Sequence, residues 1–373
     1  MRHIVVFIIA YFAFSGTAFS QKSFSDITES LEARDGLVQS YLDHEGGKIL
    51  LALPKPSGDR AVMGRYIYAE YLRAGLGSNP VGLDRGQPGT NEILSFRFVG
   101  GKVIAEVENW RYIASSDNPR EVEALRQSFA TSIIWAGDVL AKSDDGQYLV
   151  DITSFLKRDE HGIASRLKRA RQGTFKLDHR LSVVDTKAAF TFPDNIEFES
   201  LLTFTSDAPG AEVRSTTADP RNVTLIIHHS LIKLPDDGYR IRLGDDRAAI
   251  ISSTVMDYAT PLGVSMVKQL ANRHRLQKIN PGSNPSRVVK PIVYYVDNGT
   301  PEPVRSALID GAMWWADAFE KAGFIDAYSV EVLPEDAHPL DIRYNMINWV
   351  HRQTRGWSYG GSVNDPRTGE IIK

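Results

Sequence analysis

The chain has 373 residues, 42% of them hydrophobic and 24% charged, which is typical of folded globular proteins and excludes wholesale disorder, collagen and coiled coil. A formal net charge of -3 provides no overall positive field, so we expect neither nucleic acid nor an anionic membrane surface as a partner. Cysteine is absent, which excludes disulfides, a thiolate nucleophile and cysteine-ligated metals.

The first twenty residues have the pattern of a secretory signal peptide. Residues 1–3 carry the positive start, residues 4–14 are an unbroken apolar run, and Ala18 and Ser20 are the small residues before a cut at Gln21. The alternative is an uncleaved anchor, but the run is shorter than the roughly 20 residues that span a bilayer. We therefore expect an exported protein, periplasmic or extracellular, that is free of the membrane after signal cleavage.

Residues 21–115 are expected to form a β-rich amino-terminal domain. Apolar residues alternate over Leu94–Phe98 and Val103–Val107, and the pair Gly100-Gly101 between the two runs predicts a hairpin. Glycine, proline and asparagine are frequent between Gly77 and Asn91, so we expect an exposed loop there.

Residues 116–280 are expected to form a second domain, mainly antiparallel β. Apolar spacings of three and four predict a helix over Val122–Phe129 before the strands begin. Short apolar or alternating runs predict strands at residues 133–136, 148–152, 174–177, 181–184, 196–204 and 223–229.

The segment Asn280–Pro285 is the clearest predicted linker, and residues 286–373 after it change rhythm. A strand is predicted over Pro291–Val296, then a helix that opens at Pro301 and ends before Gly323. Two further strands are predicted at residues 328–333 and 342–346. Strand, helix, strand, strand is the opening order of an α/β domain.

The sheet of an α/β domain needs helices packed on its apolar faces, and only one helix is predicted here. We therefore expect the last domain to be incomplete and its strands to expose apolar surface. On that helix, Trp315 belongs to the expected core stripe, whereas the role of Trp314 stays open. The predicted fold class is therefore α+β, with β-rich amino-terminal domains followed by the incomplete start of an α/β domain.

Few residues point to chemistry by themselves. His228 and His229 are adjacent on a predicted strand and face opposite sides, so we expect one packed and one solvated histidine rather than a metal site. Gly356–Gly360 matches the Gly-x-Ser-x-Gly nucleophile elbow, but no helix signal follows, which favours a chance match. The basic run over residues 166–171 is expected to be a solvated helix face. The residues alone specify no reaction.

Several segments resemble bacterial exported zinc metallopeptidases of the met-zincin type. The similarity is strongest in Gly356–Lys373 and the preceding Asn348–Arg352. Weaker similarity lies in Lys290–Asp297, Trp315–Phe324, Phe192–Asn195 and His228–Leu231, the last two resembling the family's uncharacterised amino-terminal region. The resemblance implies that the third domain is the first part of a metzincin-like catalytic domain.

The family hydrolyses peptide bonds with a water bound to zinc, which a helix carrying His-Glu-x-x-His and a third histidine holds. No position of this chain matches that helix, so no catalytic residue and no metal ligand is carried over. The resemblance implies zinc in the full-length protein and none in this chain, which we expect to be an inactive amino-terminal part of the enzyme. The implied partner is a peptide or protein substrate.

The resemblance also implies a substrate-binding edge strand, which pairs with an extended peptide through backbone hydrogen bonds. By order, the candidate residues are Tyr359, Gly360, Gly361, Ser362 and Val363. The alternative is a plain sheet edge, closed by a hairpin with Glu370–Ile372. A different class of function also stays open, namely a non-enzymatic exported β module that binds peptide or glycan.

Overall fold

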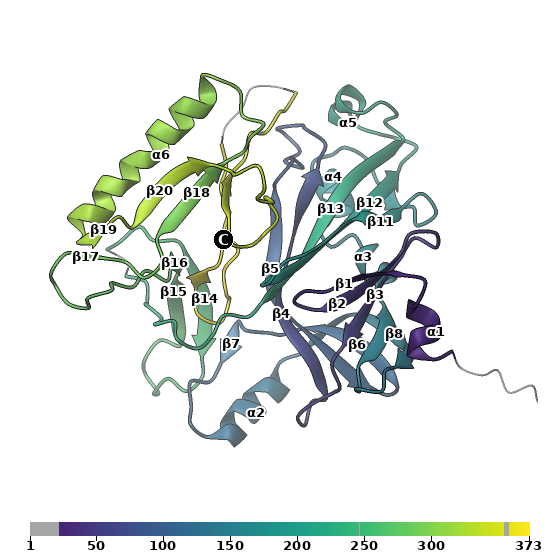
Figure 1. Ribbon diagram of the computed structural model, residues 1–373, viewed down its shortest axis with the longest axis horizontal. Coiled ribbons are helices and arrows are strands. Elements are labelled where there is room, and N and C mark those ends of the chain that lie inside the picture. The colour runs from purple at the N-terminus through teal and green to yellow at the C-terminus, as the bar shows by residue number, and fades with distance from the viewer. Residues whose placement is uncertain (1–21, 246, 354–357) are drawn as a thin grey trace, which may run out of the picture.

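The computed structural model describes residues 22–245, 247–353 and 358–373. The predicted signal peptide, residues 1–20, lies outside the described residues, as do Gly356 and Trp357 of the elbow match. Strands dominate and helices are few, which confirms the α+β class with a β-rich amino-terminal part (Figure 1). Within the described residues, no helix is long and apolar enough to cross a membrane.

A single large antiparallel sheet contains most of the strands before residue 234. Its order is β1 (Glu32–Arg34), β2 (Gln39–Asp43), β3 (Lys48–Leu53), β9 (Tyr148–Asp151), β8 (Ser132–Lys142), β6 (Lys102–Val107), β5 (Pro88–Val99), β4 (Val62–Ala74), β13 (Asn222–Lys233), β12 (Asn195–Thr205) and β10 (Lys176–Leu177), while β11 (Val183–Thr191) also pairs with β12. Strands from both sides of residue 115 pair with one another, as β4 does with β13. The predicted domain boundary at 115/116 is therefore wrong.

The predicted hairpin is confirmed by β5 and β6, which pair from Leu94↔Val107 to Val99↔Lys102. Gly100 and Gly101 connect them with φ values of 58° and 83°. Such left-handed conformations are easy for glycine and match the twist of a two-residue hairpin turn.

The sheet curls around its main core, so that strands far apart in its order share buried side chains. Leu51 of β3, Phe96 of β5 and Phe198 of β12 belong to one cluster, with Phe155 of the short helix α3 (Thr153–Leu156) among them. The remaining helices of this part are α1 (Phe24–Thr28), α2 (Pro119–Ser128), α4 (Ile163–Arg169) and α5 (Ala211–Thr216). The predicted helix at 122–129 is thus confirmed as α2, which starts three residues earlier.

A second core lies under α4 and α5, and it corrects the loop prediction. Val81 and Leu83 are buried there against Leu167 of α4, because the turn-forming residues fold this segment back onto the sheet. The segment Gly77–Asn91 is therefore not simply an exposed loop, and β5 already begins at Pro88.

The carboxyl-terminal unit is a parallel sheet in the order β20 (Tyr328–Val332), β18 (Ile292–Val296) and β21 (Asn345–Ile347). Along the chain, helix α6 (Val304–Lys321) lies between β18 and β20. The predicted strand, helix, strand, strand order is confirmed. The small sheets beside it are β7 (Tyr112–Ile113) with β14 (Ser252–Asp257) and β15 (Val267–Ala271), β16 (Arg273–His274) with β22 (Glu370–Ile371), and β17 (Ser286–Arg287) with β19 (Phe324–Ile325).

The largest exposed apolar side chains of this unit lie on the helix. Ile292 and Ile342 are buried, whereas Trp314 is 80% and Trp315 is 64% exposed. Phe319 stacks on Tyr328 with ring centroids 5.5 Å apart and so fixes which side of α6 faces the strands. Trp315 therefore does not lie in a core, which corrects its predicted placement. Of the strand residues expected to be exposed, Tyr294, Tyr344 and Met346 are partly buried.

The unit packs against the outer face of the large sheet (Figure 1). Ile67 of β4, Ile93 of β5 and Ile232 of β13 contact Ile342 and, at the periphery of this cluster, Val363. The two parts of the chain therefore share a buried apolar interface.

Candidate functional site

The candidate substrate segment, residues 359–363, is not a strand, which corrects the prediction. Only the base of the expected hairpin forms: Val363 N–H donates to the Lys373 carbonyl at 2.9 Å, and Asn364 bridges Ile371. Within the described residues the pairing stops at Val363 and Asn364, because the expected partner β22 spans only Glu370–Ile371.

The segment nevertheless keeps the property that made it a candidate. Within the described residues, the backbone groups of residues 358–362 form no backbone hydrogen bond, and residues 358–361 are exposed. Unpaired N–H and C=O groups at the surface are the groups to which an extended peptide can pair.

Contacts with Arg85, Arg352 and Pro88 hold this segment in place. The Tyr359 hydroxyl donates to the Arg85 carbonyl at 2.5 Å, and the Arg352 guanidinium lies 5.0 Å from the centre of the Tyr359 ring. Burial, with the Asp84 charge nearby, raises the pKa of Tyr359, so its hydroxyl stays protonated and remains a donor. Gly361 lies so close to Pro88 that an added Cβ would be 2.9 Å from the ring.

A buried ion pair joins the same two parts of the chain. Arg352 Nε donates to the Asp84 carboxylate at 2.8 Å, and the two side chains are 6% and 4% exposed. The next residue, Arg85, donates to the Trp349 carbonyl at 2.8 Å and to Asp297 at 3.2 Å. We call these contacts the Asp84–Arg352 latch.

A polar cluster is buried on the outer face of β12 and β13, where the carboxyl-terminal unit covers it. His228 lies between Glu197 and Glu199, with Nδ1 3.3 Å from Glu199, while Asn195 and Ser230 donate to the Glu197 carboxylate. Burial by itself would lower the pKa of His228, but the two carboxylates outweigh it and raise the pKa.

This cluster also forms hydrogen bonds with the carboxyl-terminal unit. The Asn195 amide donates to the Leu340 carbonyl at 2.9 Å and accepts from the Ile342 N–H at 3.1 Å. The Lys373 ammonium donates to the Pro339 carbonyl at 2.7 Å from the other side. Burial lowers the pKa of Lys373 to about 8.

His229 faces the main core, on the opposite side of the sheet from His228. Its Nδ1 lies 2.8 Å from the Tyr68 hydroxyl, and burial, with His228 and Arg158 nearby, lowers its pKa to about 3. The opposite orientation of the two histidines is confirmed, but the expectation that one is solvated is wrong, since both are buried.

Within the part of the chain that the structure describes, no three His, Asp or Glu side chains are grouped so that they could hold a metal ion. The basic residues at 166–171 differ in exposure. Lys168, Arg169 and Arg171 are exposed as expected, whereas Arg166 donates hydrogen bonds to the Val81 and Gly82 carbonyls.

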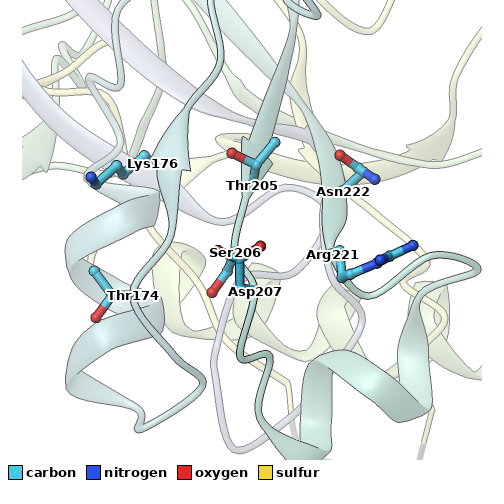
Figure 2. Close-up of a pocket in the computed structure, with 7 residues that line it drawn as sticks. All are labelled: Thr174, Lys176, Thr205, Ser206, Asp207, Arg221 and Asn222. Carbon is cyan, nitrogen blue, oxygen red and sulfur yellow. The ribbon is translucent and has the colours of Figure 1, made fainter.

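A polar surface pocket of about 350 Å³ lies where β10, β12 and β13 meet (Figure 2). Its residues are Thr174, Lys176, Thr205, Ser206, Asp207, Arg221 and Asn222. The charged ends of Lys176 and Arg221 extend in opposite directions in Figure 2. They therefore do not converge on one ligand position.

Comparison with known families places the chain. A family described as a domain of unknown function (DUF5117) matches residues 86–279, just over half of the chain. The chain belongs to the DUF5117 family. Neither the curated proteins nor the solved structures contain a match to it.

The DUF5117 match starts directly after Asp84 and Arg85 of the latch, contains the buried cluster of Glu197 and His228, and ends just before the predicted linker. Residues 359–363 and the parallel sheet lie outside it.

Sequence reasoning missed the cluster and the latch for different reasons. The polar residues Asn195, Glu197 and Glu199 recur at every second position of an otherwise apolar strand, a signal for a polar face that could have been used. Asp84 and Arg352 are 268 positions apart, and the sequence around each residue gives no signal that the two will pair.

Proposed function

We propose that this chain is the amino-terminal part of an exported zinc-dependent metallopeptidase that hydrolyses peptide bonds, and that its own role is to hold the substrate. The resemblance near the carboxyl end supports the reaction class. The observation that carries the substrate role is the backbone of residues 358–362, which forms no backbone hydrogen bond within the described residues and is exposed from 358 to 361.

Zinc would supply an activated water for attack on the peptide carbonyl. The described residues do not fit the ion, because no three possible ligands lie together. We therefore assign no step of hydrolysis to the residues of this chain.

The chain's own contribution is positional. An extended peptide beside residues 358–362 would exchange N–H and C=O hydrogen bonds with a backbone that is already held in place, which lowers the entropy lost on binding. Tyr359 and Gly361 provide that rigidity through Arg85 and Pro88. Backbone pairing selects an extended main chain and leaves side-chain preference to other contacts.

A matched pair of variants at Ser362 tests this role in the full-length product of the gene. Ser362→Pro removes a backbone donor, whereas Ser362→Ala keeps it. We expect casein hydrolysis that the chelator 1,10-phenanthroline abolishes, that Ser362→Pro loses and that Ser362→Ala retains, with thermal unfolding showing that both variants fold. Hydrolysis that resists the chelator, or equal activity of the two variants, would contradict the proposal.

The pocket of Figure 2 favours one second candidate, an exported β module that binds a polar ligand such as a glycan or peptide. Thr174, Thr205 and Asn222 offer the hydroxyl and amide groups that such ligands use. Loss of glycan or peptide binding on Thr205→Val, without any chelator-sensitive hydrolysis by the full-length protein, would favour this candidate.

A further inference from the structure

A small cavity of about 150 Å³ lies between α4 and the adjoining ends of β4 and β5. Ionisable side chains dominate its lining: Glu70, Glu160, His161, Arg166 and Arg169. Pro88 forms another part of the wall and also contacts Gly361, so the cavity adjoins the substrate segment.

Two of the lining side chains form a deeply buried pair. His161 Nδ1 lies 2.7 Å from the Glu70 carboxylate, and the side chains are 6% and 1% exposed. Within the described residues the other ring nitrogen, Nε2, has no hydrogen-bond partner. A carboxylate that fixes one nitrogen orients the imidazole and leaves the second nitrogen for a ligand.

The sequence makes room for this pair with a glycine. A Cβ on Gly89 would lie 1.4 Å from the Glu70 carboxylate, so no other residue fits without moving Glu70. The buried arrangement is thus built into the start of β5.

The remaining charges determine which ligand suits the cavity. Arg166 and Arg169 are three residues apart on α4, so they lie on one face of the helix. Arg166 is anchored to the Val81 and Gly82 carbonyls, whereas Arg169 has no ion-pair partner within the described residues. Burial raises the pKa of Glu160, although the ion pair with Arg158 opposes the effect.

We propose that this cavity binds a carboxylate group, which accepts hydrogen bonds from Arg169 and from Nε2–H of a His161 ring whose Nδ1–H donates to Glu70. The two arginines favour an anion, while Glu70 and Glu160 disfavour a second negative charge, so a monoanion fits better than a phosphate dianion. The carboxylate could belong to a free small acid or to the carboxyl terminus of a peptide. The inference does not depend on zinc or on the proposed peptidase.

Calorimetric titration of the chain tests the proposal with three probes: acetyl-trialanine with a free carboxyl terminus, the same peptide as its terminal amide, and sodium acetate as competitor. We expect the free acid to bind at least about tenfold more tightly than the amide, the ratio that one charge-assisted hydrogen bond provides. Full competition by acetate identifies a small acid as sufficient, and failure of acetate to compete identifies a peptide terminus.

The matched variants are Arg169→Ala and Lys168→Ala. Each removes one positive charge from an exposed position of α4, but Arg169 lines the cavity and Lys168 does not. We expect Arg169→Ala to weaken binding of the free acid about tenfold and Lys168→Ala to leave it within about twofold. Equal effects of the two variants, equal binding of acid and amide, or no binding of the acid would overturn the proposal.

Discussion

The neutral, buried imidazole of His229 makes the protein sensitive to acid. In the folded chain burial lowers its pKa from 6.5 to about 3, so between these values the unfolded chain binds a proton that the folded chain does not. The free energy of unfolding therefore falls as the pH falls below 6.5.

His229→Leu isolates this effect. From about pH 7 to pH 4.5, urea unfolding should show the wild type losing roughly 2.5 kcal/mol more stability than the variant does. Parallel stability profiles for the two proteins would show that His229 titrates normally in the folded state. His228 does not obscure the comparison: its raised pKa means that its contribution is fully present below 6.5 and is lost only at higher pH.

At the residue scale, the sequence predicted the opposite orientation of His228 and His229 but not that both are buried. Alternation along β13 is local, so the opposite facing of His228 and His229 followed from the strand itself. The burial of His228 depends on Glu197, 31 positions away, and on the carboxyl-terminal unit that covers both.

At the scale of elements, α6 illustrates how an amphipathic pattern can mislead. The stripe through Trp315 and Phe319 predicted one buried face, but the only described layer under the helix is a three-stranded sheet. Phe319 reaches Tyr328, while Trp315 remains 64% exposed.

The variants Trp315→Lys and Phe319→Ala separate these two positions. We expect the first to change the free energy of unfolding by no more than about 0.5 kcal/mol, as for other exposed sites, and the second to lower it by roughly 2 kcal/mol. Thermal and urea unfolding give both values. A larger loss for Trp315→Lys than for Phe319→Ala would mean that Trp315 is covered in solution.

The Asp84–Arg352 latch fixes one element to another and predicts a strong coupling. Removing either partner deprives the other buried charge of this ion pair, which costs about 3–5 kcal/mol. In a double-mutant cycle with Asp84→Ala and Arg352→Ala, the double variant should lose clearly less than the sum of the singles. The single variants should also be cleaved faster by protease in the carboxyl-terminal segment, and additive losses would show that the pair does not interact.

At the scale of the whole molecule, local patterns predicted most strands and the main helices. The predicted domain boundary at 115/116 was wrong because strands on both sides of it pair in one sheet. The pairing of β4 with β13 joins residues more than 150 positions apart, and neither strand carries a local signal of its partner. The carboxyl-terminal strand, helix, strand, strand order was predicted because each element has its own local pattern. The substrate segment was misjudged because its expected partner, β22, spans only Glu370–Ile371 and bridges Asn364 rather than residues 359–362.

The central claim is that residues 358–362 hold an extended peptide by their backbone, and amide hydrogen exchange tests it directly. With a saturating, non-cleavable extended peptide bound to the chain, exchange at these amides should slow by at least about tenfold, because each hydrogen-bonded amide must open before it exchanges. Unchanged exchange at residues 358–362 in the presence of bound peptide, with protection at the pocket of Figure 2 instead, would contradict the account.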